Sequence, residues 1–254
     1  MKKTTLLFTL LAFSAATFAQ KDFQLGLRLA PNLSWIKPDA DNVEGDGLKF
    51  GFNYGLVGDF NISENYAVST GITLVNTGGK VIRPDQQDVP NNGASITGYG
   101  KNSADIRLKY VEVPITLKLK TNEIGYMKYF GQFGFSVGVN YDASADEEFS
   151  YTIAGSTNGA TLTNKDVDYA DEINAIRAAL VVGLGAEYNL SGNTSLIFGI
   201  TFNNGFTNIF SEDTFRADKD GNALKPSDTE FTGKSDQDLK AINNYLLLNL
   251  GILF

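Results

Sequence analysis

The strongest constraint on this chain is an alternation of apolar and polar residues with a period of two, repeated along its length. Phe50, Phe52 and Tyr54, for example, share one face of an extended segment, whereas Gly51 and Asn53 share the other. Such alternation is typical of a β-strand whose two faces meet different surroundings. Eight segments show it, at 23–30, 48–62, 66–74, 110–120, 129–141, 180–190, 195–206 and 245–254. The sequence therefore predicts an all-β fold of eight strands.

The fourth of these segments contains two irregularities. Its alternation changes phase near Tyr110, which predicts a β-bulge. Pro114 lies inside the segment, where it cannot donate a backbone hydrogen bond to a neighbouring strand.

The connections between the segments alternate in length. Short ones lie at 63–65, 121–125 and 191–193, and long ones at 37–47, 80–105, 142–172 and 207–240. Outer-membrane barrels have this asymmetry, with short periplasmic turns and longer extracellular loops. We therefore expect an eight-stranded antiparallel transmembrane β-barrel with both termini in the periplasm. The acid-rich stretch at 166–172 is expected to form a short helix within its loop.

The chemistry of the two strand faces favours a transmembrane barrel over a soluble one. The less apolar face is rich in Gly, Asn, Ser and Thr, whereas a water-facing surface would carry more Lys and Glu. A polar lumen and an apolar exterior in contact with outer-membrane lipid account for this composition. Aromatic residues near the segment ends match the interfacial girdles of such barrels, namely Trp35, Tyr54, Phe60, Tyr66, Tyr126, Tyr141 and Tyr188.

The first nineteen residues have the features of a cleaved signal peptide. Lys2 and Lys3 precede an apolar stretch that is shorter than the roughly 20 residues a membrane-spanning helix needs. Small residues at Thr17 and Ala19 then place cleavage before Gln20. We expect a signal peptide at 1–19 and a barrel domain at 20–254, located in the outer membrane of a Gram-negative-type bacterium.

The composition argues against several classes of function. The chain has no Cys and no His, so it lacks thiol nucleophiles, disulfides, and the commonest metal ligand and general base. Its formal net charge of −8 disfavours nucleic acid as a partner. We therefore expect a protein that is not an enzyme and holds no cofactor.

Charged residues on the less apolar face are predicted to point into the lumen. An eight-stranded barrel has room for little beyond its own side chains. We expect the charges to form an ion-pair network that plugs the barrel, and the alternative is a path for protons or ions. The residues are Arg28, Lys49, Asp59, Glu112, Lys118, Arg177 and Glu187.

Two groups of loop carboxylates are candidates for Ca²⁺ binding. Neither has the spacing of a calcium-binding loop, because Val43 and Ala223 occupy positions that need an oxygen ligand and Gly. We interpret both groups as solvated loop segments. They are Asp39, Asp41, Glu44 and Asp46 in the first, and Asp218, Asp220 and Asn222 in the second.

The last strand resembles the C-terminal assembly signal of outer-membrane barrels. The resemblance is carried by Tyr245, Ile252 and the terminal Phe254. It implies that the barrel-assembly machinery is a partner during insertion.

The whole mature chain resembles the PorT-like family of porin-like outer-membrane β-barrel domains. The carrying features are the opening at 25–32, the run at 51–55, and Tyr-Val-Glu-Val-Pro at 110–114 before Leu117 and Lys118. The resemblance implies an eight-stranded barrel without one fixed function, and the namesake of the family is linked to a secretion system.

Three functions follow from these observations. The first is a non-catalytic barrel with a plugged lumen, whose outer loops bind a partner or support the envelope. The second is a small passive diffusion channel. The third is an accessory component of a secretion system. An extracellular or secretion-system protein is the expected partner.

Overall fold

The computed structural model describes residues 23–91, 93–153, 159–228, 231 and 236–254. The expected signal peptide at 1–19 lies outside these residues. No helix in the described part of the chain is long and apolar enough to cross a bilayer.

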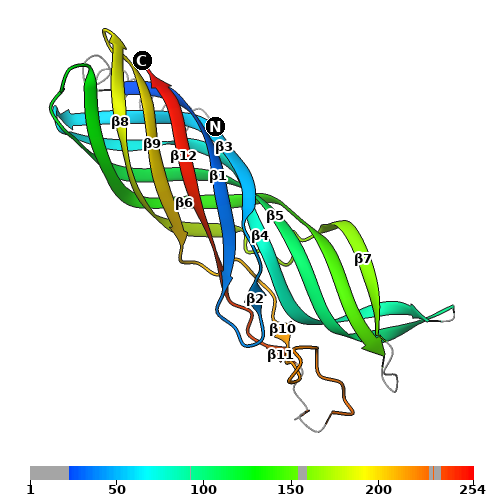
Figure 1. The fold of residues 1–254 in the computed structure, drawn as a ribbon. Helices are drawn as coiled ribbons and strands as arrows, with labels where there is room; N and C mark the ends of the chain where they lie inside the picture. Colours follow the sequence, from blue (N-terminus) through cyan, green and yellow to red (C-terminus); the bar gives the residue numbers. More distant parts are fainter. Residues whose placement is uncertain (1–22, 92, 154–158, 229–230, 232–235) are drawn as a thin grey trace, which may run out of the picture.

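Eight strands close into one antiparallel barrel, as the alternation predicts (Figure 1). Each strand pairs with its neighbour along the ring, and β1 closes the ring by pairing with β12 from Gly26↔Leu253 to Pro38↔Ala241. In ring order the strands are β1 (Phe23–Pro38), β3 (Lys49–Ser63), β4 (Tyr66–Asn91), β5 (Ala94–Lys120), β6 (Met127–Ile153), β8 (Ile176–Ser191), β9 (Thr194–Gly205) and β12 (Ala241–Leu253).

The two faces of the barrel are inverted relative to a water-soluble barrel. Apolar side chains point outward, and Phe133 and Leu184 expose 51% and 68% of their surface. Charged side chains point inward, and Asp59 and Arg177 expose 0% and 1%. Lipid is the surroundings in which an apolar exterior is stable, so the barrel has the surface of a membrane-spanning protein.

The two ends of the barrel differ. One end, here called the turn end, holds the three short turns and both ends of the described chain, since Leu25 and Phe254 exchange two backbone hydrogen bonds. At the other end, here called the extension end, β4, β5 and β6 continue beyond the barrel (Figure 1). There β6 also pairs with β7 (Gly159–Asp168), and three two-residue strands lie nearby: β2 (Glu44–Gly45), β10 (Thr214–Phe215) and β11 (Asp236–Gln237).

This extension corrects two expectations about the long connections. The stretches 80–105 and 142–172 are largely strand rather than loop, and β4 and β5 pair without interruption from Thr73↔Glu112 out to Asn91↔Ala94. The expected helix at 166–172 is absent, because β7 runs to Asp168 and a turn follows, with the Glu172 amide donating to the Tyr169 carbonyl at 3.1 Å. Carboxylates in this stretch take part in strand and turn contacts instead.

A register shift lies beside Tyr110 in the ladder between β5 and β6, but the bulge is in the neighbouring strand rather than in the predicted segment. Lys109 pairs with Asp142 and Tyr110 pairs with Asn140, so the extra residue is Tyr141 on β6. The ladder between β4 and β5 is interrupted where Pro114 lacks an N–H, because Thr70 pairs with Ile115 and the next pair is Thr73 with Glu112.

Apolar side chains fill the extension end of the lumen. Ile106 and Leu108 of β5 pack there with Ile209 and Phe210, which belong to the loop between β9 and β12. The loop between β1 and β3 contributes Val43. The larger of the two clusters of buried apolar side chains therefore lies at this mouth of the barrel, where chain segments fold over it.

Candidate functional site in the lumen and at its two ends

Four charged side chains meet inside the barrel near the turn end and are here called the turn-end cluster: Asp59, Lys118, Lys120 and Glu187. Lys118 Nζ lies 2.7 Å from Asp59 Oδ2 and 2.5 Å from Glu187 Oε1. β3 and β8 are opposite one another in the ring, so Lys118 links the two walls across the lumen. Lys120 Nζ lies 3.3 Å from Glu187 Oε2 and 3.7 Å from Asp59 Oδ2. Two cations and two anions alternate, which leaves the cluster neutral.

Neighbouring groups hold the turn-end cluster in place. The Ser69 hydroxyl donates to Asp59 Oδ1 at 2.6 Å. Lys118 Nζ lies 4.3 Å from the centroid of the Phe130 ring, within the range of a cation–π contact. All four charged side chains are at most 6% exposed, so removing one charge would leave its partners buried and uncompensated.

A second group of side chains, here called the central cluster, is organised by Arg177 of β8. Its Nη1 donates to Glu112 Oε1 at 2.7 Å, and its Nη2 donates to Asn203 Oδ1 at 2.6 Å and to the Asn243 carbonyl at 2.8 Å. Tyr245 donates to the other Glu112 oxygen at 2.8 Å, and its ring centroid lies 4.9 Å from the guanidinium carbon of Arg177. The cluster therefore joins β5 to β8, β9 and β12 across the barrel.

Gly138 on β6 makes room for this arrangement. A Cβ atom at this position would lie 2.6 Å from Glu112 Cγ, which is closer than carbon atoms can approach. A residue with a side chain would push Glu112 away from Arg177 and Tyr245.

Arg28 lies between the two clusters and makes no ion pair within the described residues. Its Nη2 donates to Thr73 Oγ1 at 2.8 Å. Two cavities of about 20 Å³ each border it, lined by hydroxyl and amide side chains such as Thr116, Gln132 and Asn203. A cavity of that size holds about one water molecule.

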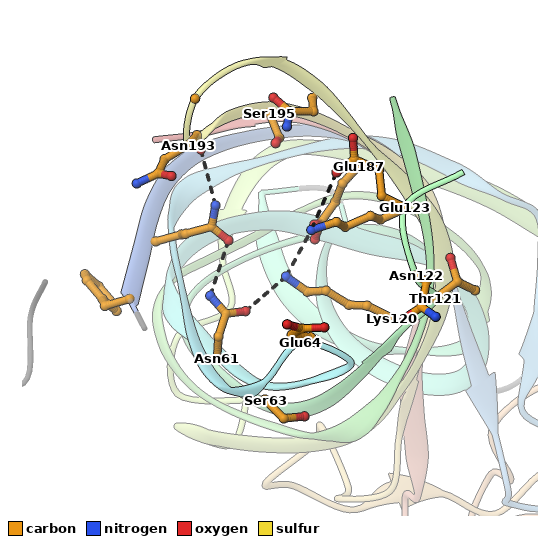
Figure 2. Close-up of a pocket in the computed structure, with 15 residues that line it drawn as sticks. Asn61, Ser63, Glu64, Lys120, Thr121, Asn122, Glu123, Glu187, Asn193 and Ser195 are labelled. Carbon is orange, nitrogen blue, oxygen red and sulfur yellow. Dashed lines mark hydrogen bonds and ion pairs between the residues drawn. The ribbon is translucent and has the colours of Figure 1, made fainter. Parts of the chain in front are cut away.

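A wide polar hollow opens at the turn end (Figure 2). Its volume is about 510 Å³, and Lys120 and Glu187 of the turn-end cluster belong to its lining. Gln24 crosses part of it, donating to the Asn193 carbonyl at 3.2 Å and accepting from Asn61 Nδ2 at 3.4 Å. The hollow therefore borders the turn-end cluster at Lys120 and Glu187, whereas Asp59 and Lys118 lie behind them.

The predicted lumen residues are thus distributed over four places, and Arg28 lies alone between the two clusters. Asp59, Lys118 and Glu187 form the turn-end cluster together with Lys120, and Glu112 and Arg177 form the central cluster. Lys49 differs from the expectation, because its Nζ pairs with Asp105 of β5 at the rim of the extension end. Lys49 is the first residue of β3 and lies at the height where the closed ring ends and the extension begins.

Sequence reasoning missed several partners of these charges. Lys120 lies on the same strand face as Lys118, so the alternation of this strand could have identified Lys120 as a lumen residue. The alternation also places Asn243 on the face of Tyr245, but nothing in the sequence indicates that the Asn243 carbonyl meets Arg177.

The residues of the proposed assembly signal lie in different surroundings. Tyr245 points into the lumen, whereas Phe254 is exposed. Ile252 pairs with Leu27 of β1 and Leu196 of β9.

The extension end includes a strongly acidic stretch of the chain. The stretch 142–172 contains one cation, Lys165, and eight carboxylates: Asp142, Asp146, Glu147, Glu148, Asp166, Asp168, Asp171 and Glu172. Cations of β4 and β5 pair with some of them, as when Arg107 contacts Asp146 at 2.8 Å and Asp166 at 3.0 Å. Hydrogen bonds from Arg107 and from the Asp166 amide lower the pKa of the Asp146 carboxyl to about 2.

The two candidate calcium loops also lie at the extension end. Asp218 Oδ1 accepts from the backbone amides of Asp220 and Asn222 at 2.9 Å each, so its carboxylate organises a turn. Asp46 pairs with Lys80 at 2.8 Å. Among the described residues, no group of three or more carboxylates is arranged to hold a metal ion.

A closed antiparallel barrel with an apolar exterior and a charged, hydrogen-bonded interior has the architecture of outer-membrane barrel proteins. The sequence agrees with this class. Residues 18–211 match the family described as "Outer membrane protein beta-barrel domain", and the chain belongs to that family. No curated protein matches the chain.

Several solved structures are similar to this chain at low sequence identity. Neisserial surface protein A (NspA) is 10% identical, with a TM-score of 0.41 and coverage of 91% of this chain and 95% of that one. OprG from Pseudomonas aeruginosa is 11% identical, with a TM-score of 0.46 and coverage of 93% and 98%. The outer membrane protease OmpT from Escherichia coli is 8% identical, with a TM-score of 0.35 and coverage of 93% and 97%.

Proposed function

We propose that this protein is a non-catalytic outer-membrane barrel with a closed lumen, and that it acts through its extension end by binding a partner protein or supporting the envelope. The observation that carries the proposal is the pair of side-chain clusters that join opposite walls of the barrel. Lys118 bridges β3 and β8, and Arg177 with Tyr245 bridges β8, β12 and β5. Between them, the cavities beside Arg28 hold about one water each.

The proposal places the extension end outside the cell and the turn end in the periplasm. Short turns on the periplasmic side are usual in outer-membrane barrels, and an even number of strands brings both termini to that side. The folded, charged sheet of β4 to β7 is then the part of the protein that other molecules meet first.

Cysteine labelling on intact cells tests this orientation, and the chain contains no native Cys to interfere. Thr97→Cys changes an exposed residue of the extension, and Asn122→Cys changes an exposed residue of a short turn. A membrane-impermeant maleimide is expected to label Thr97→Cys on intact cells and Asn122→Cys only after the outer membrane is opened. The reverse pattern would show that the extension faces the periplasm.

A role beside a secretion system has one supporting observation, the resemblance to PorT-like domains. Within the Tyr-Val-Glu-Val-Pro run, Tyr110 and Glu112 both lie beside Arg177. The guanidinium carbon of Arg177 is 6.0 Å from the centroid of the Tyr110 ring. Recovery of secretion components with the protein from native membranes would favour this role, and their absence would leave it without support.

A further inference from the structure

The strand β7 has one free edge. It pairs with β6 alone among the described strands, and it forms the outermost strand of the extension (Figure 1). In an antiparallel ladder, every second residue turns its N–H and C=O away from its partner strand. The stretch from Gly159 to Asn164 therefore presents a row of backbone donors and acceptors that no described strand satisfies.

Half of this edge lacks the features that normally prevent a strand from docking. Protected edges carry charges, prolines or bulges. In β7 these features begin after Asn164, where Lys165 and Asp166 interrupt the ladder and Asp166 adopts a φ of 54°. The residues from Gly159 to Asn164 include no charge and no Pro. This part of the edge is free to accept another strand.

The two faces beside the free edge differ in chemistry. On one face, Leu162 pairs with Phe149, whose ring stacks on Tyr151 at a centroid distance of 5.3 Å. On the other face, Thr163 pairs with Glu148, which is exposed and makes no ion pair within the described residues. Residues of an added strand would alternate between the side of Leu162 and Phe149, which is apolar, and the side of Thr163, where Glu148 is the one carboxylate among the described partners.

We propose that the edge from Gly159 to Asn164 is a docking site for an extended segment of a partner protein in which basic and apolar residues alternate. Backbone hydrogen bonds would supply the attachment, and the alternation would supply the specificity. The inference rests on the proposed function, because it names the kind of partner that the extension end would bind.

Charge argues against a second copy of this chain as the occupant. The stretch 142–172 carries eight carboxylates and one Lys, so pairing two β7 edges would place two acidic surfaces against each other. Residues 159–164 carry no charge themselves, but the carboxylates beside them, Glu148 among them, would approach those of the second copy and repel them. A basic strand would instead be attracted by the same carboxylates.

The test is amide hydrogen exchange of the full protein refolded in lipid, with and without a short end-blocked peptide that alternates Lys and Val. In the free protein, amides of β7 that bond to β6 should exchange slowly and the alternate amides quickly. The peptide is expected to slow exchange in the fast set only. A peptide alternating Glu and Val should leave both sets unchanged. Equal protection by both peptides, or none by either, would overturn the proposal.

Two controls separate strand addition from simple attraction of charges. In one control peptide the backbone nitrogens of the odd-numbered residues are methylated, and in the other those of the even-numbered residues. Both peptides keep their charge, but if a ladder forms, one of them must lose binding because its methyl groups replace the N–H groups that bond to β7. Glu148→Gln should weaken binding about two- to five-fold, the range of one exposed ion pair, whereas Glu64→Gln at the turn end should not. Binding that survives methylation in both phases would contradict docking at the edge, while a closed lumen would still stand.

Discussion

Arg177 and Glu112 depend on each other because both are buried in the barrel wall. Their side chains expose 1% and 4%, and they meet at 2.7 Å. Breaking such a pair by removing one partner costs about 3–5 kcal/mol, because the remaining charge is left without compensation. The same reasoning applies to the turn-end cluster, where each carboxylate meets two ammonium groups.

This dependence gives a double-mutant prediction. Arg177→Met and Glu112→Gln are each expected to lower the free energy of unfolding by about 3–5 kcal/mol. The double variant should lose clearly less than the sum of the two, because no uncompensated charge remains. Urea unfolding in lipid vesicles gives the free energy of unfolding of the unaltered protein, the two single variants and the double variant. Losses that simply add would mean that the two groups do not stabilise one another.

Asp146 gives a pH prediction outside the membrane. Its carboxyl has a folded pKa of about 2, below its usual 3.8, because Arg107 and the Asp166 amide donate to it. A group with a lowered folded pKa stabilises the fold above its unfolded pKa, so this contribution is lost as the pH falls from 3.8 toward 2. Carboxyl NMR should show the titration near pH 2, and Arg107→Gln should raise the midpoint. Lys109→Gln, which removes the partner of Asp142, should leave it unchanged.

At the scale of the strands, alternation predicted the ring and its faces because lipid and lumen differ sharply in polarity. It missed the extension because the polarity of the two faces exchanges there. Along β5, Val111 and Ile115 point outward to lipid, whereas Arg107 and Lys109 occupy the same face further along. Beyond the apolar belt the outer face is polar, as a face in water would be, and the apolar residues lie on the inner face under the loops. The phase change near Tyr110 marks this boundary.

The partners of the lumen charges could be predicted only in part. Alternation shows that Glu112 and Arg177 face inward, since each belongs to the inner face of its strand. Which charges meet depends on the stagger between strands that are distant in sequence, and the residue pattern does not determine that stagger. The contacts of Lys118 with Asp59 and Glu187 therefore follow from the geometry of the closed ring and not from the residue pattern.

Trp35 provides a prediction for the position of β1 in the bilayer. It is the only Trp in the chain, and its ring stacks on Phe202 of β9 at a centroid distance of 6.0 Å. It lies toward the extension end of β1, where an interfacial aromatic girdle is expected. Lipids brominated near the headgroup should quench its fluorescence more than lipids brominated near the chain end. Stronger quenching from the chain ends would place this end of β1 inside the hydrocarbon.

At the scale of the whole molecule, export gives a further prediction. Cleavage before Gln20 would make Gln20 the first residue of the membrane form. N-terminal sequencing of protein extracted from outer membranes should therefore begin at Gln20. Ala19→Asp should block cleavage, because the enzyme requires a small residue there, whereas Ala19→Gly should not. Uncleaved protein in the outer membrane would contradict the division at residue 19.

The central claim is that side chains close the lumen, and single-channel recording of the refolded protein in a planar bilayer tests it most directly. If the ion-pair clusters close the lumen as proposed, hydrated ions have no continuous path through it, and the bilayer should stay silent while circular dichroism of the same sample shows folded β-structure. Stable, stepwise openings from folded protein would contradict the claim and make the protein a small diffusion channel.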